Sequence, residues 1–431
     1  MTTYSDKVVK TKYIDPRVYV HNLPETFDLD LRESAYMPNM KLGFLGVVTA
    51  STEHSYNKLL GAGALIRNIQ LLDGKTVLSQ LNEAQFYKAF LNQNRSNADA
   101  QVKHSNLDLS ALGLSIEGNS NRIARIAAVA FANAKSPGVL DPSASATIDL
   151  MEYFPLLRTM NQMNQHLPTQ IFKNLRVVVE LNAIITNQII FDVTQGITTI
   201  RPILIVDAIV DPNVVDNMNK NMQSIAWHEV EHDQFVIPAA ATGVNSSGVD
   251  QKLTVKLNGF NNKTLDNMLI VKEIGNSALE VNSATNGIRG YGKYSSQASY
   301  NQVCQFRVNG RNILPRQGIT GNMERLAYVV DTFGDCANYI GSNLFQLNSD
   351  TIMANGGDFA GQLDYIGIYI GKQINDLQIN YSRTSVKVGT RIIKNATNAL
   401  LIGHVYGSVR KQLLFMQGGM YRIEYIQTAM E

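Results

Sequence analysis

Three residues near the middle of the chain have the types and spacing of a zinc site. His228, Glu229 and His232 form the pattern H-E-x-x-H within AWHEVEHDQFVIPA, residues 226–239. On an α-helix the two histidines would lie about 6 Å apart, so one zinc ion could bind both and the glutamate could act as the general base of a metalloprotease. On a β-strand the same two residues would stand about 13 Å apart, which is too far for one metal ion.

The residues around this pattern favour a strand. QFVIP, residues 234–238, is rich in strand-forming residues and ends at a proline, and no extension supplies the third histidine of a zinc peptidase. Residues 215–232 contain no helix breaker, so a helix there stays an alternative, although Met218, Met222 and Ile225 would give it only a thin apolar face. We therefore interpret the match as a polar strand or loop and expect no metal site.

Two glycine-containing stretches are similar to nucleotide-binding loops but lack an essential glycine. DGKT, residues 73–76, would need a glycine where Ile69 stands, and it reads better as a hairpin with Asp73-Gly74 as its turn. GAGALI, residues 61–66, lacks the last glycine of the dinucleotide fingerprint and precedes an expected strand instead of a helix. We expect no bound cofactor at either stretch.

No set of residues forms a recognisable catalytic group. The pattern G-x-S-x-G is absent, and Cys304 lies in an apolar strand-like run that predicts an inert core thiol. Glu231 and Asp233 lie close in sequence, but such pairs are usually solvated. The remaining histidines are far apart in the sequence and have no acidic partner pattern: His21, His54, His104, His166 and His404. We expect no catalytic residue and therefore no enzyme.

Composition limits the classes of partner. The 431 residues are 45% hydrophobic but only 17% charged, and a weakly charged surface suits broad contact with other proteins. The net charge is +2 without a basic stripe, so direct binding of nucleic acid is not expected. Cys304 and Cys336 cannot make a disulfide framework, which favours folding in a reducing interior. The first residues lack the apolar core of a signal peptide, and no apolar run is long enough to span a bilayer.

Strand-like runs extend over the whole length, and helical patterns are few. Runs rich in valine, isoleucine and aromatic residues, bounded by turn-forming residues, occur at 63–72, 174–182, 201–210, 251–260, 304–314, 365–371, 376–383, 398–407 and 420–427. Helical spacing predicts helices at 83–93, at 148–165 with Pro155 in a first turn, and at 321–335 with Asn322 as cap and Gly334 as terminator. Because strands and helices do not alternate, antiparallel sandwiches or barrels are expected.

The two halves have a faint common order, which predicts two copies of one β-unit. In each half a helix is followed by three strand-like runs, and the junction falls in AAATGVNSSGVD, a glycine- and serine-rich stretch typical of a linker. The linker at 239–250 leaves parts of about 238 and 181 residues, and each part is large enough for an eight-stranded jelly roll. The expected fold class is therefore all-β.

An ordered set of short motifs resembles the double jelly-roll major capsid proteins of polinton-like viruses and virophages, within the lineage of adenovirus hexon. The matching stretches run from about residue 60 to the end, at 63–81, 148–182, 201–211, 231–238, 305–319, 323–335 and 411–426. This resemblance implies an all-β fold of two tandem eight-stranded antiparallel jelly rolls with a few short helices in connecting loops. The implied organisation is an N-terminal arm at 1–24, a first jelly roll at 25–238, a linker at 239–250 and a second jelly roll at 251–431. Helices 148–165 and 321–335 would lie in the F–G connections. The same resemblance implies a homotrimeric, pseudo-hexagonal capsomer that tiles an icosahedral shell.

The resemblance also implies partners and a location. Neighbouring capsomers, penton proteins and minor capsid proteins would contact the trimer, which would be made in the host cytoplasm and reside in the virion capsid. The arm at 1–24 would contact an inner membrane or a minor protein, with disorder until assembly as an equal alternative. A carbohydrate-binding or spike-type β-sandwich is the alternative function, although Trp227 is the only tryptophan and offers little stacking surface.

Overall fold

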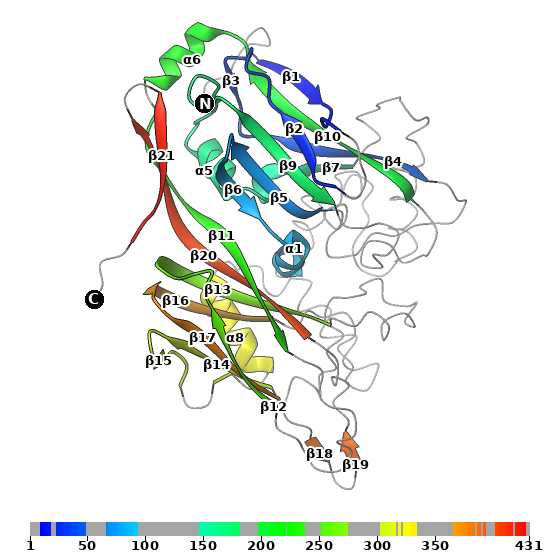
Figure 1. Cartoon of the computed structure of the whole chain (residues 1–431), viewed down its shortest axis with the longest axis vertical. Coiled ribbons are helices and arrows are strands. Elements are labelled where there is room, and N and C mark those ends of the chain that lie inside the picture. The colour runs from blue at the N-terminus through cyan, green and yellow to red at the C-terminus, as the bar shows by residue number, and fades with distance from the viewer. Residues whose placement is uncertain are drawn as a thin grey trace. The chain divides into compact units, whose positions relative to one another are not determined.

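The computed structural model of the chain divides into two compact units (Figure 1). The first comprises residues 1–85, 101–230 and 410–426, and the second comprises 86–100, 231–409 and 427–431. The division falls inside two long strands, β11 (Ile225–Ile237) and β20 (Leu401–Met416). The structure describes residues 9–18, 23–48, 66–93, 146–181, 197–220, 222–237, 251–274, 302–315, 318–319, 322–333, 365–383, 386–388, 391–393, 401–416 and 419–427.

The first unit contains two antiparallel sheets. One has the order β1-β10-β4-β7, formed by β1 (Val9–Ile14), β10 (Ile197–Ile209), β4 (Lys41–Val48) and β7 (Ala146–Asp149). The short strands β3 (Ala35–Tyr36) and β8 (Leu167–Pro168) continue this sheet beside β10. The other has the order β2-β9-β5-β6, formed by β2 (Glu25–Asp28), β9 (Leu175–Leu181), β5 (Ile66–Asp73) and β6 (Thr76–Leu81).

Alternating side chains explain which face of β9 packs into the core. Leu175, Val177, Val179 and Leu181 are buried, and the residues between them are partly exposed. Because successive side chains of a strand point to opposite faces, this period of two directs one face into the core. The valines also suit the strand conformation, since β-branched side chains pack well on a pleated surface.

The second unit repeats the arrangement. One sheet has the order β11-β20-β13-β16, where β13 is Lys263–Ile274 and β16 is Tyr365–Ile374. The other has the order β12-β17-β14-β15, formed by β12 (Gln251–Leu257), β17 (Leu377–Arg383), β14 (Gln302–Val308) and β15 (Arg311–Asn312). β21 (Met420–Tyr425) is the fifth strand of the sheet that contains β20 and pairs with the end of β20, in residues that belong to the first compact unit. Outside these sheets, β18 (Val386–Val388) pairs with β19 (Arg391–Ile393).

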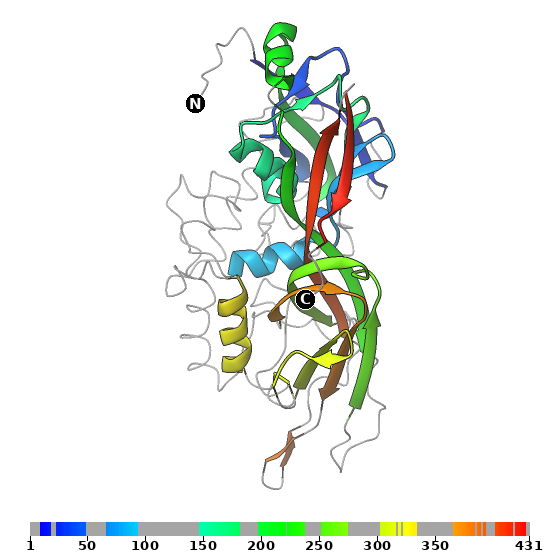
Figure 2. The same cartoon turned by 90° about the vertical axis from the view of Figure 1, so that its left-hand side faces the viewer.

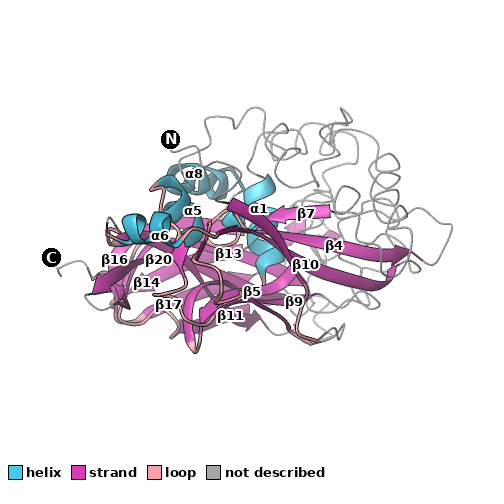
Figure 3. Cartoon of the chain, turned by 90° about the horizontal axis from the view of Figure 1, so that it is seen from above, coloured by secondary structure: helices cyan, strands magenta, loops and turns pink. Residues whose placement is uncertain are grey.

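Both units are jelly rolls. With the strands lettered B to I in chain order, the first unit pairs β1-β10-β4-β7 as B-I-D-G and β2-β9-β5-β6 as C-H-E-F. The second pairs β11-β20-β13-β16 as B-I-D-G and β12-β17-β14-β15 as C-H-E-F. This is the two-sheet, eight-stranded arrangement of a jelly roll, so the expected fold class is confirmed, and strands predominate over helices (Figure 3).

Residues 9–14, which lie in the segment predicted as an N-terminal arm, form the B strand of the first jelly roll. They pair with β10 in continuous register from Val9 opposite Ile209 to Ile14 opposite Leu204. The sequence gives little sign of this strand, because only two of its six residues are strongly apolar and its burial pattern is mixed. The boundaries of arm, jelly rolls and linker stay a prediction, and the linker at 239–250 lies outside the described residues.

The helices lie in connections between strands, and one of them lies in a different connection from the predicted one. Helix α8 (Asn322–Phe333) joins strands F and G of the second jelly roll, as expected. The stretch 148–165 is not one helix, because its first residues complete β7 and a 3₁₀ turn at Leu150–Glu152 precedes α5 (Pro155–Gln162). Helix α5 therefore lies between G and H. Pro155 occupies its first turn as predicted, where its missing N–H costs nothing.

Two further helices, α1 and α6, follow strands of the first jelly roll. Helix α1 (Ala84–Gln93) follows strand F of the first jelly roll, and α6 (Pro212–Asn219) follows strand I. Residues 86–93 of α1 belong to the second compact unit, in which this helix lies beside α8 (Figure 2). Phe90 of α1 packs edge-to-face on Phe333 of α8, with ring centroids 5.1 Å apart.

The hairpin predicted around DGKT is present, but its turn is shifted by one residue. Asp73 pairs with Thr76, so Gly74 and Lys75 form the two-residue turn instead of Asp73 and Gly74. Gly74 has φ +60°, a conformation that a two-residue hairpin needs at its first central position and that glycine adopts without strain. The stretch closes a β-hairpin of the first jelly roll and has no phosphate loop.

We expect Gly318→Ala to destabilise the second jelly roll by about 2–3 kcal/mol. Gly318 has φ +106°, and a Cβ there would lie 2.8 Å from the carbonyl carbon of Cys304. The added methyl would separate Ile319 from Cys304, whose backbones exchange hydrogen bonds of 3.0 and 3.2 Å. Thermal unfolding followed by circular dichroism measures the loss.

Gly310→Ala is the matched control. Gly310 also has a positive φ, +80°, but nothing lies within 4 Å of the position of its Cβ. Its replacement should cost only the backbone strain, about 1 kcal/mol. Equal losses for the two variants would contradict the proposed overlap at Gly318.

Candidate functional site

The H-E-x-x-H residues lie on a strand, as the flanking residues predicted. β11 runs from Ile225 to Ile237, and α6 ends at Asn219, so the helical alternative for residues 215–232 is wrong. Ile225, Trp227 and Glu229 are buried, whereas His228 is exposed. Within the described part of the chain, no group of three or more histidine, cysteine, aspartate or glutamate side chains could hold a metal ion.

Glu229 is fully buried in the first unit and accepts hydrogen bonds from three sides. Ser79 Oγ donates at 2.9 Å and the Gln80 backbone N–H at 3.3 Å to Oε1, and Trp227 Nε1 donates at 2.8 Å to Oε2. Burial raises the pKa of Glu229 to about 7, against the opposing charge of Lys411 and these three donors. This carboxyl group has the perturbed pKa of many catalytic acids, but it is 0% exposed and cannot reach a substrate.

His232 belongs to the second unit and contacts a second histidine. Its Nε2 lies 3.2 Å from Nδ1 of His404 on β20, and its ring lies 5.0 Å from the ring of Tyr406. Burial, together with the neighbouring His404, lowers the pKa of His232 to about 3. No sequence pattern indicates this pair, because 172 positions separate the two histidines.

Glu231 and Asp233 are not simply solvated, contrary to expectation. Glu231 is 8% exposed, and its Oε2 accepts from Lys263 Nζ at 2.5 Å. Asp233 Oδ2 accepts from the Gly259 backbone N–H at 3.1 Å. Both carboxylates therefore stabilise the start of strand D within the second jelly roll.

The other candidate residues are dispersed. Cys304 is a buried free thiol within the second core, as predicted, and His166 is buried in the first unit. Burial lowers the pKa of His166 to about 4. Residues that lie outside the described part of the chain are His21, His54, His104, Cys336 and residues 61–65 of GAGALI.

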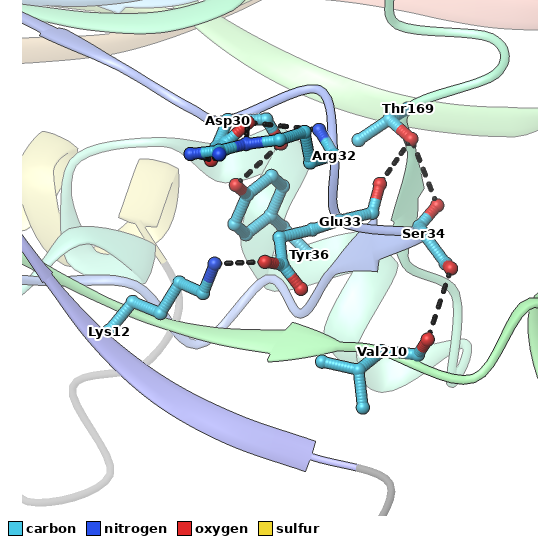
Figure 4. Close-up of polar contacts among 8 residues, drawn as sticks. All are labelled: Lys12, Asp30, Arg32, Glu33, Ser34, Tyr36, Thr169 and Val210. Atoms are coloured by element: carbon cyan, nitrogen blue, oxygen red, sulfur yellow. Dashed lines mark hydrogen bonds and ion pairs between the residues drawn. The ribbon is translucent and has the colours of Figure 1, made fainter.

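A polar cluster that the sequence did not reveal holds the loop before β3 (Figure 4). Lys12 of β1 forms an ion pair with Glu33, and Tyr36 Oη donates to the Asp30 carbonyl at 2.9 Å. Thr169 Oγ1 donates to the Glu33 carbonyl at 2.6 Å. These contacts join residues up to 136 positions apart, so no local motif could predict them. They fix the B strand and the C–D connection of the first jelly roll and offer no reactive group.

The chain resembles several solved viral capsid structures over its whole length. PBCV-1 VP54, fitted into a reconstruction of the virophage Sputnik, superposes with a TM-score of 0.54 at 10% identity and covers 99% of both chains. The PBCV-1 virus capsid gives a TM-score of 0.52 at 11% identity and also covers 99% of both chains. The mavirus major capsid protein gives 0.51 at 10% identity, covering 99% of this chain and 92% of its own. Neither a protein-family model nor a curated protein sequence matches the chain.

These likenesses define the fold. The neighbours are double jelly-roll capsid proteins, and this chain has the same double jelly-roll fold from end to end. At 10–11% identity the match concerns the arrangement of strands and not particular residues. In the described residues no helix is both long and apolar enough to cross a membrane.

Proposed function

We propose that this chain is a major capsid protein that trimerises into pseudo-hexagonal capsomers and tiles an icosahedral viral shell. The observation that carries the proposal is the whole-length match of two consecutive jelly rolls to viral capsid structures, at 99% coverage of both chains for the first neighbour. A partial match could reflect one shared domain, whereas this match includes both consecutive jelly rolls.

Geometry gives a physical reason for the capsomer. Two jelly rolls in each chain give six in a trimer, and six similar jelly rolls arranged around a three-fold axis approach hexagonal symmetry. Hexagonal units tile a closed shell when pentagonal units fill its vertices. The low charge content supports this use, because wide lateral faces can then meet without desolvating many ions.

The internal chemistry of the chain supports a structural role over the carbohydrate-binding alternative. Trp227, the only tryptophan, is 4% exposed and donates its N–H to Glu229, so its ring is not available for stacking on a sugar. Glu229, a carboxyl group whose pKa is raised by burial to about 7, is enclosed. We therefore propose that the chain is not an enzyme.

The partners of the capsomer also belong to the proposal. Neighbouring capsomers, penton proteins and minor capsid proteins would contact it in the virion, after synthesis in the host cytoplasm. The arm predicted at 1–24, in which Val9–Ile14 form β1, would contact an inner membrane or a minor protein. Direct contact with nucleic acid is not expected, because the chain carries 38 basic against 36 acidic residues without a basic stripe.

The test is the oligomeric state of the purified chain. Size-exclusion chromatography with light scattering should give a mass three times that of the 47.7 kDa chain. Electron microscopy of the same sample should show near-hexagonal particles. A monomer that persists at high protein concentration, or a dimer, would contradict the proposal.

A further inference from the structure

Strand β21 forms an edge of its sheet in the part of the chain that the structure describes. Of the described strands it pairs only with β20, from Met416 opposite Met420 to Lys411 opposite Tyr425, and Figure 1 shows it alongside the end of that strand. Met420 and Tyr425 are 59% and 40% exposed. A strand edge presents backbone N–H and C=O groups at the spacing that a further strand needs.

The register of β21 on β20 determines which of its peptide groups face outward. Just beyond the strand, the backbone N–H of Ile426 donates to the carbonyl of Arg410 at 3.0 Å, so these two residues form a hydrogen-bonded pair. Hydrogen-bonded and non-hydrogen-bonded pairs alternate along an antiparallel ladder, so the even-numbered residues of β21 direct their peptide groups toward β20. The peptide groups of the odd-numbered residues, with Ile423 at their centre, therefore point away from β20.

The charges of β21 are complementary to those of a second copy of the same strand. Arg422 and Glu424 flank Ile423, and their side chains are 67% and 36% exposed. When two β21 strands lie antiparallel with Ile423 opposite Ile423, Arg422 of each copy stands opposite Glu424 of the other. In this register the outward peptide groups of the two strands also face each other as hydrogen-bonded pairs. One register therefore satisfies both the backbone and the charges.

Contacts with the first unit hold β21 in place. The ring of Tyr421 packs on the ring of Phe172 with centroids 5.0 Å apart, and Tyr421 Oη donates to Asp73 Oδ2 at 2.8 Å. Because side chains alternate along a strand, Arg422 and Glu424 lie on the opposite face from Tyr421. A strand that is already fixed in this way loses little conformational freedom when it pairs with another strand.

Strand β1, at the end of the other described sheet that it forms with β10, shows the opposite charge pattern. It carries Lys10 and Lys12 and no acidic residue. An antiparallel copy centred on Thr11 would place lysine opposite lysine, and such like-charged pairs disfavour edge-to-edge pairing. The self-complementary charges of β21 are therefore not a general property of the strand edges in this chain.

We propose that β21 is a contact surface for a second copy of this chain, and that two chains pair edge to edge across a two-fold axis at Ile423. The inference rests on the proposed function for its place in the virion: a two-fold contact does not occur within a three-fold trimer, so it joins neighbouring capsomers. One short strand from each chain buries less surface than a stable interface needs, so the pairing is weak between free capsomers. In a shell, many such contacts act together.

Disulfide formation at the two-fold axis tests the pairing. Ile423→Cys, in the full-length chain with Cys336→Ser, would place two cysteines opposite each other with Cα atoms about 5.5 Å apart, within the range of a disulfide. Under mild oxidation, covalent dimers should form at least about tenfold faster than for Leu31→Cys in the same background, as measured on non-reducing gels. Leu31 is 57% exposed on the same unit and reports random collision. Equal rates for the two variants would overturn the proposal.

Exchanged charges test the register. In the Ile423→Cys background, Arg422→Glu places four acidic residues around the axis and Glu424→Arg places four basic ones, so each variant alone should cross-link at least about tenfold more slowly. In a mixture of the two variants, acidic positions face basic positions, and cross-linking should return to the rate of the parent. Arg32→Glu, the same charge change at a side chain that is 88% exposed elsewhere on the unit, should leave the rate unaltered. A mixture that cross-links no faster than either variant alone would rule out this register.

Light scattering of the same samples separates this contact from the capsomer itself. If trimers form and their edges pair, the oxidised Ile423→Cys protein should have a mass above that of three chains. Covalent dimers in the absence of trimers would support the pairing and contradict the proposed capsomer. Trimers that do not cross-link would contradict the pairing and leave the capsomer supported.

Discussion

Replacing Phe306 by alanine should lower the free energy of unfolding of the second jelly roll by about 3–5 kcal/mol. Phe306 lies at the centre of β14 with 0% exposure, within the core that also contains Phe260, Ile379 and Val405. Removing its ring deletes apolar contacts and leaves a cavity, which close-packed surroundings fill only in part.

Thermal unfolding should detect this loss clearly. A change of this size shifts the melting temperature of a unit of this length by roughly 6–20 °C. Because the chain has two units, the measurement should follow exchange in β14 and β17 as well as overall circular dichroism. Arg307→Ala is the control, since its exposed side chain neighbours Phe306 and should matter by only about 0.5 kcal/mol. Similar shifts for both variants would show that β14 does not face the core as described.

Glu229→Leu should destabilise the first unit by about 3–5 kcal/mol. The leucine would remove the acceptor for Ser79, Gln80 and Trp227. Buried donors that lose their acceptor retain the full cost of desolvation. Urea unfolding followed by the fluorescence of Trp227 measures the effect, because this ring is the only tryptophan and contacts the altered site.

The pH dependence of this effect has a defined sign. The folded-state pKa of Glu229 is raised to about 7 from an ordinary value of 4.5, so the folded form holds this proton more tightly than the unfolded form. The stabilisation from this group is complete below pH 4.5 and is lost as the pH rises through 7. Wild-type stability minus that of Glu229→Leu should therefore decrease between pH 4.5 and 7.

His228→Ala controls for the sequence motif. His228 is exposed one residue from Glu229, and its replacement should change stability by about 0.5 kcal/mol. Metal analysis of the same samples tests the zinc interpretation: a stoichiometric zinc ion that is lost in His228→Ala would overturn our assignment of this motif to a plain strand.

Local pattern was sufficient for most of the strands and for the fold class. Buried and partly exposed residues alternate along β9, and β14, β16 and β17 are rich in strand-forming residues. Both features can be recognised from consecutive residues, because one face of each strand packs against a core. Pattern also favoured a strand or loop over a helix for H-E-x-x-H, because Phe235, Val236 and Ile237 follow it and end at Pro238. The sequence pattern did not predict β1, because its apolar and polar side chains show no regular period. It predicted one helix at 148–165, whereas the first residues of this apolar run belong to β7 and later ones to α5.

By itself, the sequence determined the kind of protein: an all-β chain with two similar halves, few charges and no recognisable catalytic set. Only the tertiary structure decided which of its polar residues act together. Ser79 meets Glu229 across 150 positions, and His232 meets His404 across 172. The physical reason is that strand alternation depends on neighbouring residues, whereas burial and partners depend on which distant strands pair. Those pairings fix the pKa of Glu229 and His232, and no spacing along the chain encodes them.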